Sequence, residues 1–392
     1  MINQEMLQYG KAPNAIREIY AYGLQRKEVF GTDKVFDFSL GNPSVPVPQE
    51  INDCIENLTT RLPSDVHGYT PSKGNMGVAE VIAADLESRF GLPVNPNQLY
   101  LVAGAAGALA SSFKGISNPG DEIIVIAPFF PEYRVWIEAI GCTCVPVLAS
   151  VPTFQPDVAA LEAAITPRTS AIVINSPNNP TGAIYTRESL QDLCWMLKEK
   201  EIEYGHPIYL ISDEPYRELT YGGEVTWVPD LYNDTIVCYS WSKSFSLPGE
   251  RIGYVYVNDR MDNASDVIAA VAGAGRAMGY VNAPSLFQYV IAQCIDAPID
   301  LAPYWHNRRV LTEGLKELGY EYVEPDGAFY LWVRALENDA EAFCERAKQF
   351  ELLLVPSNGF GVEGWVRIGY CTDYDIIVRS MPAFKLLKES YN

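Results

Sequence analysis

Apolar residues in the middle of the chain occur in short unbroken runs rather than in alternation with polar residues. The segments 122–127 and 170–175 consist largely of Val, Ile and Ala, which is typical of strands covered on both faces. The same pattern predicts seven strands, at 99–102, 122–127, 142–148, 170–175, 207–212, 235–240 and 251–257. Helical patterns intervene, for example at 78–89, 156–165 and 187–200. This order predicts an α/β fold on a mostly parallel sheet.

The pattern changes character from about Pro303 onward. A long helical pattern from Tyr304 to Leu318 precedes a β-like run at 327–333, and a second β-like run follows at 365–370. No internal repeat or low-complexity linker interrupts the chain. Because 392 residues exceed one ordinary hydrophobic core, we expect two domains.

Residues suited to chemistry follow five of the predicted strands. They are Ala105, Phe130, Asn179, Asp213 and Ser240. In sheets of this kind, ligands bind beyond the carboxyl ends of the strands. Five strand ends with such residues therefore predict a single site at one edge of the sheet.

The stretch from Ser240 to Phe245 (Ser-Trp-Ser-Lys-Ser-Phe) places Lys243 just after a buried run, with Arg251 eight residues later. A lysine amine can condense with an aldehyde to an imine, and serine and arginine side chains suit a phosphate. Pyridoxal phosphate carries both an aldehyde and a phosphate. The stretch therefore indicates this cofactor, held through Lys243.

Four upstream motifs supply further contacts in a specific order. They are the glycine turn at 99–109, the aromatic loop at 123–131, the Asn-Pro-Thr-Gly turn at 171–182 and the strand ending in Asp213-Glu214-Pro215-Tyr216. Together they resemble the class I/II aminotransferases of the fold-type I pyridoxal-phosphate enzymes, in particular the aspartate-aminotransferase-like ones, from about Leu40 to Arg367. The resemblance implies a large cofactor-binding domain at 41–290 and a small α+β domain at 291–392. It further implies that the segment 1–40 packs with the small domain and that a long helix from about Asn282 joins the two.

The resemblance also implies catalytic roles for three residues. Lys243 holds the cofactor and later moves the substrate α-proton, for which burial beside Arg251 should lower its pKa. Asp213 keeps the cofactor ring nitrogen protonated, while the neighbouring Glu214 points away; a helix cap is the alternative reading of Asp213. Tyr216 donates to the ring oxygen.

The remaining cofactor contacts concern the ring and the phosphate. The resemblance assigns the ring oxygen to Asn179 together with Tyr216, and ring stacking to Phe130, although a core Phe would look the same. It assigns the phosphate to Ser240, Ser242, Arg251 and the backbone amides of Ala105 and Ala106 at a helix N-terminus. Many relatives carry a hydroxyl in that turn, whereas Ala106 offers only its N–H.

Substrate contacts are assigned in the same way. Arg367 matches the residue that binds the α-carboxylate, with Asn179 and the backbone of Gly41 beside it. Tyr69 matches a tyrosine that reaches the phosphate of the neighbouring subunit, which implies a homodimer with shared active sites; an ordinary surface tyrosine is the alternative. Arg276 could bind the distal carboxylate of an acidic substrate or simply cap a helix end.

Composition narrows the class of partner. The net charge of −20 and the pI near 4.6 disfavour nucleic acid and anionic membranes. The eight cysteines show no disulfide framework, and with only three histidines we expect no catalytic metal. No apolar run reaches the ~18 residues of a spanning helix and no leader is evident, so we expect a soluble cytoplasmic protein.

The sequence favours transfer of an amino group between an L-amino acid, with aspartate or glutamate preferred, and a 2-oxo acid. A β-lyase acting on sulfur amino acids would keep the same residues, and an aminotransferase for aromatic or other neutral amino acids also stays open. A regulator that binds pyridoxal phosphate without turnover would need a further DNA-binding domain. The glycine pattern at 273–279 lacks the spacing of a nicotinamide site, so a dehydrogenase is disfavoured.

Overall fold

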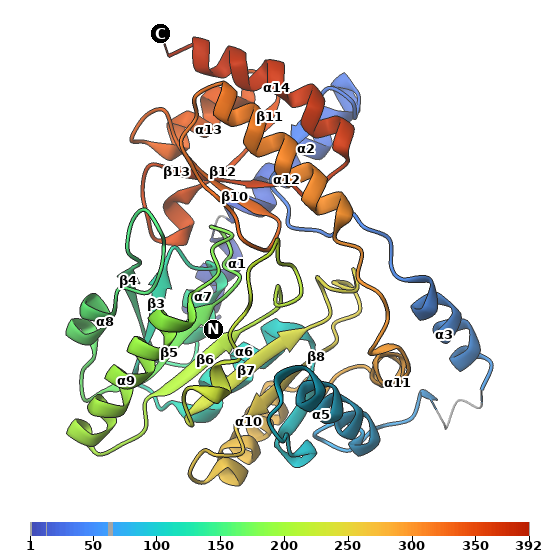
Figure 1. Ribbon diagram of the computed structural model, residues 1–392, viewed down its shortest axis with the longest axis vertical. Helices are drawn as coiled ribbons and strands as arrows, with labels where there is room; N and C mark the ends of the chain where they lie inside the picture. The colour runs from blue at the N-terminus through green and yellow to red at the C-terminus, as the bar shows by residue number, and fades with distance from the viewer. Residues whose placement is uncertain (1, 13, 62–65, 392) are drawn as a thin grey trace.

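The computed structural model describes residues 2–12, 14–61 and 66–391 (Figure 1). Its larger sheet has seven strands in the order β2-β8-β7-β6-β5-β3-β4. Their bounds are β2 Leu99–Val102, β3 Glu122–Ala127, β4 Thr143–Leu148, β5 Thr169–Asn175, β6 Tyr209–Asp213, β7 Thr235–Ser240 and β8 Gly253–Val257. These agree with the predicted strands to within two residues, so the predicted α/β sheet is confirmed.

The direction of β8 brings one functional residue to the site. β8 runs antiparallel to both of its neighbours, β2 and β7, while the pairs among β3, β4, β5, β6 and β7 are parallel. Gly253 at the start of β8 therefore pairs with Ser240 at the end of β7. Because of this reversal, Arg251 lies at the same edge of the sheet as the carboxyl ends of the parallel strands.

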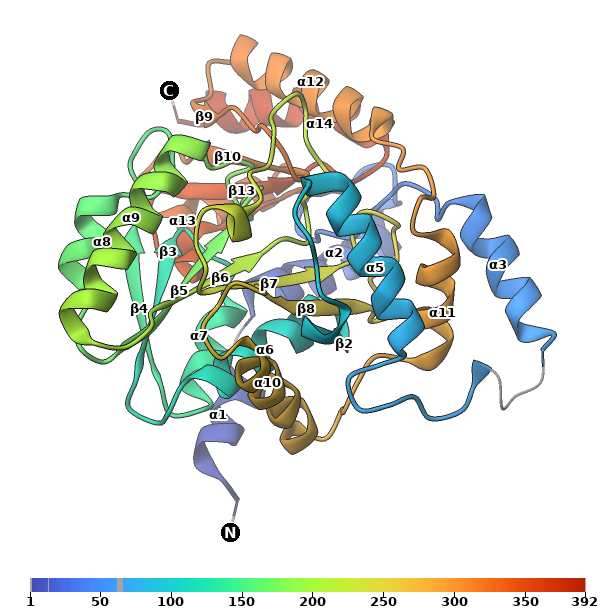
Figure 2. The same cartoon turned by 60° about the horizontal axis from the view of Figure 1, so that its bottom comes forward.

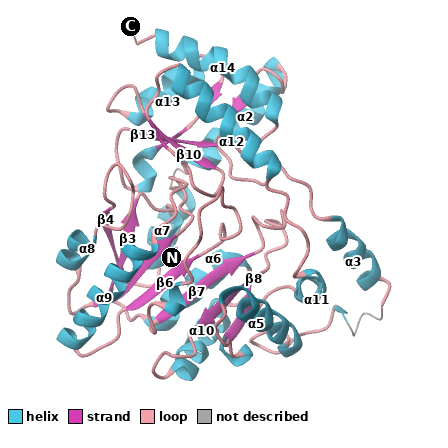
Figure 3. Ribbon diagram, in the orientation of Figure 1, coloured by secondary structure: helices cyan, strands magenta, loops and turns pink. Residues whose placement is uncertain are grey.

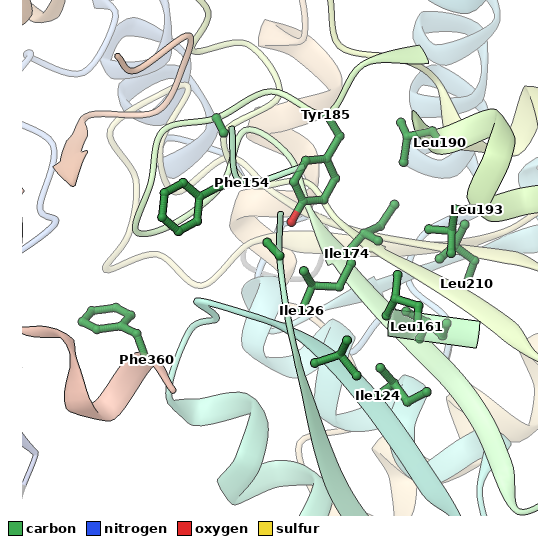
Figure 4. Packing of buried hydrophobic residues seen from close by; sticks show 14 of the residues in the cluster. Ile124, Ile126, Phe154, Leu161, Ile174, Tyr185, Leu190, Leu193, Leu210 and Phe360 are labelled. Atoms are coloured by element: carbon green, nitrogen blue, oxygen red, sulfur yellow. The ribbon is translucent and has the colours of Figure 1, made fainter. Parts of the chain in front are cut away.

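Alternate residues of the central strands pack into different cores on opposite faces of the sheet. Ile124, Ile172 and Leu210 face a core that includes α8 (Val158–Ala164) and α9 (Arg187–Tyr204), shown in Figure 4. The intervening residues face α6 (Gly104–Ile116), α7 (Glu132–Glu138) and α10 (Ala264–Met278). Apolar side chains are required on both faces, which explains why these strands lack alternation.

The edge of the larger sheet around β2, β8 and β7 is covered by three further helices, α3 (Gln49–Thr59), α5 (Met76–Phe90) and α11 (Ser285–Cys294). The sequence defines both ends of α5. Asn75 caps the first turn of α5 by accepting a hydrogen bond from the Val78 amide, and Gly91 ends the helix in the left-handed conformation.

A smaller sheet lies above the larger one in the view of Figure 3. Its order is β12-β13-β10-β9, and every pair is antiparallel. The strands are β9 Tyr322–Val323, β10 Tyr330–Arg334, β12 Val355–Pro356 and β13 Trp365–Gly369. The helices of this part are α12 (Ala302–Glu317), α13 (Ala340–Lys348) and α14 (Tyr374–Glu389).

The N-terminal segment packs against this C-terminal part. β1 (Phe36–Asp37) pairs in parallel with β11 (Leu352–Leu353), and α2 (Ala15–Phe30) lies nearby. By contrast, α1 (Gln4–Lys11) buries none of its residues and extends from the body in Figure 2. The division into domains at residues 40 and 290 stays a prediction.

The expected long helix from about Asn282 is wrong. The chain forms two helices instead, α11 and α12, separated by an irregular segment around Ala297 and Pro298. Proline lacks a backbone N–H and disfavours helical conformation in the residue before it, which explains the break. Nowhere in the described ranges does a helix combine the length and apolar character required to cross a bilayer.

Candidate active site

Lys243 lies in the turn that follows β7. Its side chain is half-buried, and its Nζ donates a 2.7 Å hydrogen bond to the backbone oxygen of Gly41. Burial lowers the pKa of Lys243 to about 8; Cys371 opposes this shift, while the positive charges of Arg367 and Arg251 reinforce it. An amine with such a pKa is partly neutral near pH 7 and can accept a proton. The sequence pointed to Arg251 alone, but Arg367 from β13 has the larger effect.

Asp213 is the last residue of β6 and is 5% exposed. Its Oδ2 accepts hydrogen bonds from the Tyr133 hydroxyl and from Asn175 Nδ2, the latter at 3.4 Å. Its Oδ1 is buried and has no hydrogen-bond partner among the described residues. Burial raises the pKa of Asp213 to about 7. A buried, unpartnered carboxylate oxygen is costly, so it fits a cationic ring N–H supplied by a cofactor.

The neighbouring Glu214 points away from Asp213. Its carboxylate accepts hydrogen bonds from the Ser212 hydroxyl at 2.7 Å and from Arg217 Nη1 at 3.1 Å. Arg217 is itself buried, and its Nη2 donates to the Tyr254 hydroxyl at 3.0 Å. The charge of Glu214 is therefore paired behind the sheet edge.

Asn175, at the end of β5, holds both Asp213 and the Asn-Pro-Thr-Gly turn. Its Nδ2 donates to the Asp213 backbone oxygen at 2.8 Å, and its Oδ1 accepts the Asn179 backbone N–H at 2.7 Å. The side chain of Asn179 is then oriented toward Arg367, whose Nη1 donates to Asn179 Oδ1 at 3.1 Å. One buried amide thus sets the positions of two predicted site residues.

Arg367 is 2% exposed and lies between aromatic rings. Its guanidinium carbon is 4.4 Å from the ring centre of Tyr330 and 5.3 Å from that of Phe360. Nη2 donates to the Ser39 backbone oxygen at 2.6 Å, while Nε is buried and lacks a partner within the described ranges. A buried guanidinium that pairs with no carboxylate in the described part of the chain fits a site for an anionic substrate group.

Tyr216 contacts the smaller sheet. Its hydroxyl lies 3.1 Å from the hydroxyl of Tyr330, the first residue of β10. Burial raises the pKa of Tyr216 well above its ordinary value, so the phenol remains protonated at neutral pH. A protonated phenol is the form that can donate to a ring oxygen.

The N-terminus of α6 and Arg251 form the region expected to hold phosphate. The helix has no side-chain cap, so Ala105 and Ala106 stand in a first turn whose amides need partners. Arg251 lies over this turn, and a Cβ on Gly104 would be 3.0 Å from its Nη2. Gly104 has φ +71, and Arg251 itself has φ +52, a strained conformation for a residue with a side chain. Ser240 and Ser242, hydrogen-bonded to each other at 3.1 Å, stand at the neighbouring end of β7.

Phe130 is half-buried in the loop after β3. Its ring packs edge-on against Tyr133 at 5.8 Å and Trp136 at 6.1 Å. The edge contacts hold the ring upright in the loop, so that a flat ligand could stack on it.

Two predicted residues do not join this cluster within one chain. Tyr69 is fully exposed, and Arg276 is exposed near the end of α10. Across the described residues, neither side chain forms a hydrogen bond or ion pair with the cluster. The glycine pattern at 273–279 lies at the end of α10 and just after it.

Several residues of the cluster escaped sequence reasoning. Tyr133 and Asn175 bind Asp213, and Tyr330 contacts both Tyr216 and Arg367. Asn175 could have been noticed, because it ends a predicted strand at the same edge as Asp213. Tyr330 lies within the apolar run at 327–333, and Tyr133 lies between two charged residues at the start of α7, so neither local pattern signals a role at the sheet edge.

Comparison with known proteins agrees with this geometry. The family model for aminotransferase class I and II matches residues 33–376. The aspartate aminotransferase of Thermotoga maritima is 29% identical over 354 residues, covering 89% of this chain and 90% of that protein. The aspartate/prephenate aminotransferase of Thermus thermophilus is 30% identical over 386 residues, covering 95% of each.

Solved structures match over the full length. A crystal structure of an aminotransferase from Eubacterium rectale has 47% identity and a TM-score of 0.98, covering 100% of this chain and 99% of that one. The aspartate aminotransferase from Thermus thermophilus with maleate has 27% identity and a TM-score of 0.87, covering 99% of each chain. The predicted fold and activity are confirmed: the protein is an enzyme that transfers amino groups. The chain belongs to the class I and II aminotransferase family.

Proposed function

We propose that this aminotransferase uses pyridoxal phosphate and moves an amino group between an acidic L-amino acid, aspartate or glutamate, and a 2-oxo acid. The observation that carries the proposal is the Oδ1 of Asp213, which is buried, lacks a hydrogen-bond partner among the described residues and lies at the strand end next to the one followed by Lys243. When bound, the cofactor supplies an aldehyde and an electron-withdrawing ring. Binding of the cofactor, binding of the substrate and transfer of the proton are carried out by residues of the protein.

The residues that would hold the cofactor surround its three polar groups. Asp213 would face the ring nitrogen, Asn179 and Tyr216 the ring oxygen, and Phe130 the ring face. The phosphate would be bound by Ser240, Ser242, Arg251 and the amides of Ala105 and Ala106. These donors include one fixed positive charge, which offsets the strongly acidic net charge of the chain locally.

Lys243 has two tasks in this proposal: it binds the cofactor, and its Nζ takes the proton from the substrate α-carbon. The lowered pKa makes the second task feasible near neutral pH, because a fraction of the amine is already unprotonated. The hydrogen bond to Gly41 oxygen keeps the amine at the site.

Arg367 would bind the substrate α-carboxylate with a planar fork, with Asn179 and Gly41 at its side. The stacked rings of Tyr330 and Phe360 fix the plane of the guanidinium. A fixed fork orients the substrate and so selects which bond at the α-carbon breaks.

The active enzyme is proposed to be a homodimer. Tyr69 is fully exposed and Arg276 is exposed on one chain, as expected of residues that complete a site in a second copy. Tyr69 would reach the partner's cofactor phosphate. Arg276 would bind the distal carboxylate of an acidic substrate. The name aspartate aminotransferase, carried by the relatives from Thermotoga and Bacillus subtilis, supports such a substrate.

The test combines a lysine variant with a substrate panel. Lys243→Ala should lose the pH-sensitive visible absorbance of lysine-bound cofactor and should not complete turnover. The matched control is Lys385→Ala, which removes an exposed lysine on α14. This variant should keep both the visible absorbance and turnover. Absorbance changes of wild-type enzyme with each of the twenty amino acids then rank the substrates. Full activity of Lys243→Ala would refute the assignment, and ammonia with pyruvate as products would identify a β-lyase.

A further inference from the structure

Tyr330 contacts the substrate-carboxylate residue and the predicted ring-oxygen donor at the same time. It is 2% exposed at the start of β10. Its hydroxyl lies 3.1 Å from that of Tyr216, and its ring centre is 4.4 Å from the guanidinium carbon of Arg367. A buried phenol that joins two functional groups through different parts of its side chain is well placed to couple them.

The hydroxyl of Tyr330 also touches the backbone that receives Lys243. A Cβ added at Gly41 would lie 1.8 Å from the Tyr330 oxygen, so any other residue at this position would displace that hydroxyl. The backbone oxygen of the same Gly41 accepts the hydrogen bond from Lys243 Nζ at 2.7 Å. Tyr330 therefore packs directly against the residue that anchors the reactive amine.

The turn before Tyr330 is held rigidly. Ala328 has φ +57, an unfavourable conformation for a residue with a Cβ. Its N–H donates to the Leu219 backbone oxygen at 2.8 Å, and its own oxygen accepts a 2.6 Å hydrogen bond from the Tyr221 hydroxyl. Both partners follow Tyr216 closely in the chain. The segments that carry Tyr216 and Tyr330 are thus joined by hydrogen bonds close to the two tyrosines.

The protonation states of the two phenols determine what their contact can do. Burial raises the pKa of Tyr330 to about 12 and that of Tyr216 well above its ordinary value. Each hydroxyl therefore keeps its proton near neutral pH, and only one of the two protons can lie between the oxygens. When Tyr330 is the donor, the proton of Tyr216 is free to point to another acceptor.

We propose that Tyr330 is a positioning residue, which donates to Tyr216 and so strengthens the hydrogen bond from Tyr216 to the cofactor ring oxygen, while its ring stacks on Arg367. The proposal rests on the role assigned to Tyr216 above. A hydroxyl that accepts one hydrogen bond becomes a better donor in the next, because chains of hydrogen bonds polarise one another. The ring stacking is a separate effect that acts on Arg367 and carboxylate binding.

The two effects can be separated by substitution. Tyr330→Phe removes the hydroxyl and keeps the ring, whereas Tyr330→Leu removes both. Tyr322→Phe is the matched control, because it removes a half-buried hydroxyl from the neighbouring strand β9. The measurements are the pH midpoint of the visible absorbance of lysine-bound cofactor, and the dissociation constant of maleate as a non-reacting dicarboxylate probe.

A weaker hydrogen bond from Tyr216 leaves the cofactor ring oxygen more basic. The proton on the nitrogen that joins Lys243 to the cofactor is then held more tightly, so the pH midpoint of the absorbance rises. We expect Tyr330→Phe to raise the midpoint by about a few tenths of a pH unit, less than Tyr216→Phe does. Maleate affinity should stay within about twofold in Tyr330→Phe and fall about 3- to 10-fold in Tyr330→Leu, as expected for a lost cation–π contact. Tyr322→Phe should change neither quantity.

The double variant Tyr216→Phe/Tyr330→Phe decides whether Tyr330 acts through Tyr216. Its midpoint should equal that of Tyr216→Phe alone. An additional shift of full size in the double variant, or no shift in Tyr330→Phe while Tyr216→Phe shifts, would overturn this inference and leave the proposed function intact. An unchanged midpoint in Tyr216→Phe would instead overturn the role of Tyr216 itself, and this inference with it.

Discussion

The Nη1 atom of Arg367 lies 3.1 Å from the side-chain oxygen of Asn179, although 188 positions separate the two residues in the chain. Arg367 comes from the smaller sheet and Asn179 from the turn after β5 of the larger sheet. Because the oxygen of Asn179 is used by Arg367, its amide nitrogen remains available for the cofactor ring oxygen. The contact therefore joins the proposed substrate and cofactor sites across the two sheets.

Arg367→Lys tests the need for a planar fork at this position. The variant keeps the positive charge but cannot contact Asn179 and a carboxylate in one plane. We expect kcat/KM for the best amino acid to fall about 100-fold, equivalent to about 3 kcal/mol. Arg334→Lys is the control, since Arg334 lies at the end of β10 and stacks on Trp365 at 5.3 Å. Equal losses in the two variants would contradict a specific role of Arg367.

Asp213 gives a prediction on pH and stability in the cofactor-free protein. Its pKa in the folded state is about 7, against 3.8 for an ordinary Asp, because burial disfavours the charged carboxylate. The folded state therefore holds the proton more tightly, and its stability falls as the pH rises between these values. Stability should fall by about 1.4 kcal/mol per pH unit from pH 5 to 6, measured as the difference between wild type and Asp213→Asn in denaturant unfolding. Parallel pH profiles of the two proteins would contradict this environment for Asp213.

The larger sheet was predictable because burial on both faces leaves a direct trace in the sequence. Strands such as β3 and β5 carry unbroken apolar runs, at 123–127 and 171–174, so they can be located without knowledge of the contacts. The edge of the sheet then brings Asp213, Ser240 and Lys243 together, since parallel strands end at one side. Local signals and topology were sufficient for this part of the site.

The rest of the site depends on contacts between distant segments. Tyr330 becomes a site residue only because β10 is placed against Tyr216, and no local pattern encodes that placement. Tyr133 is similar, since its hydroxyl meets Asp213 from a different element, α7. The expected helix from Asn282 was wrong for another reason. Pro298 is a local signal that interrupts a helix, but the family resemblance was given more weight than this signal.

Tyr69 gives a prediction on shared active sites. A dimer made of one Lys243→Ala chain and one Tyr69→Phe chain can rebuild one intact site if Tyr69 acts on the partner's cofactor. Mixing the two impaired variants under conditions of subunit exchange should therefore restore part of the wild-type activity. Mixing Lys243→Ala with itself is the blank, and Tyr374→Phe, which alters another exposed tyrosine, should remain fully active alone. No recovery after confirmed exchange would count against shared sites.

Arg276 gives the last prediction, on substrate choice. It is exposed near the C-terminal end of α10, eight residues before Pro284, the N-cap residue of α11. If it binds the distal carboxylate of an acidic substrate in the partner's site, its removal strips a charge-assisted contact from those substrates alone. Such a contact is worth about 2–5 kcal/mol, so Arg276→Ala should lower kcat/KM for aspartate and glutamate about 30-fold or more.

The comparison that isolates this role uses a neutral amino acid and a second arginine. Activity of Arg276→Ala toward the best uncharged substrate should stay within about twofold, because the α-carboxylate site at Arg367 is untouched. Arg379→Ala removes an exposed arginine on α14 and should leave both substrate classes unchanged. An equal loss for acidic and neutral substrates would show that Arg276 stabilises the end of its helix instead, where its backbone oxygen already accepts the Gly279 N–H at 3.1 Å. No loss for either class would leave the acidic substrate without a residue to recognise it.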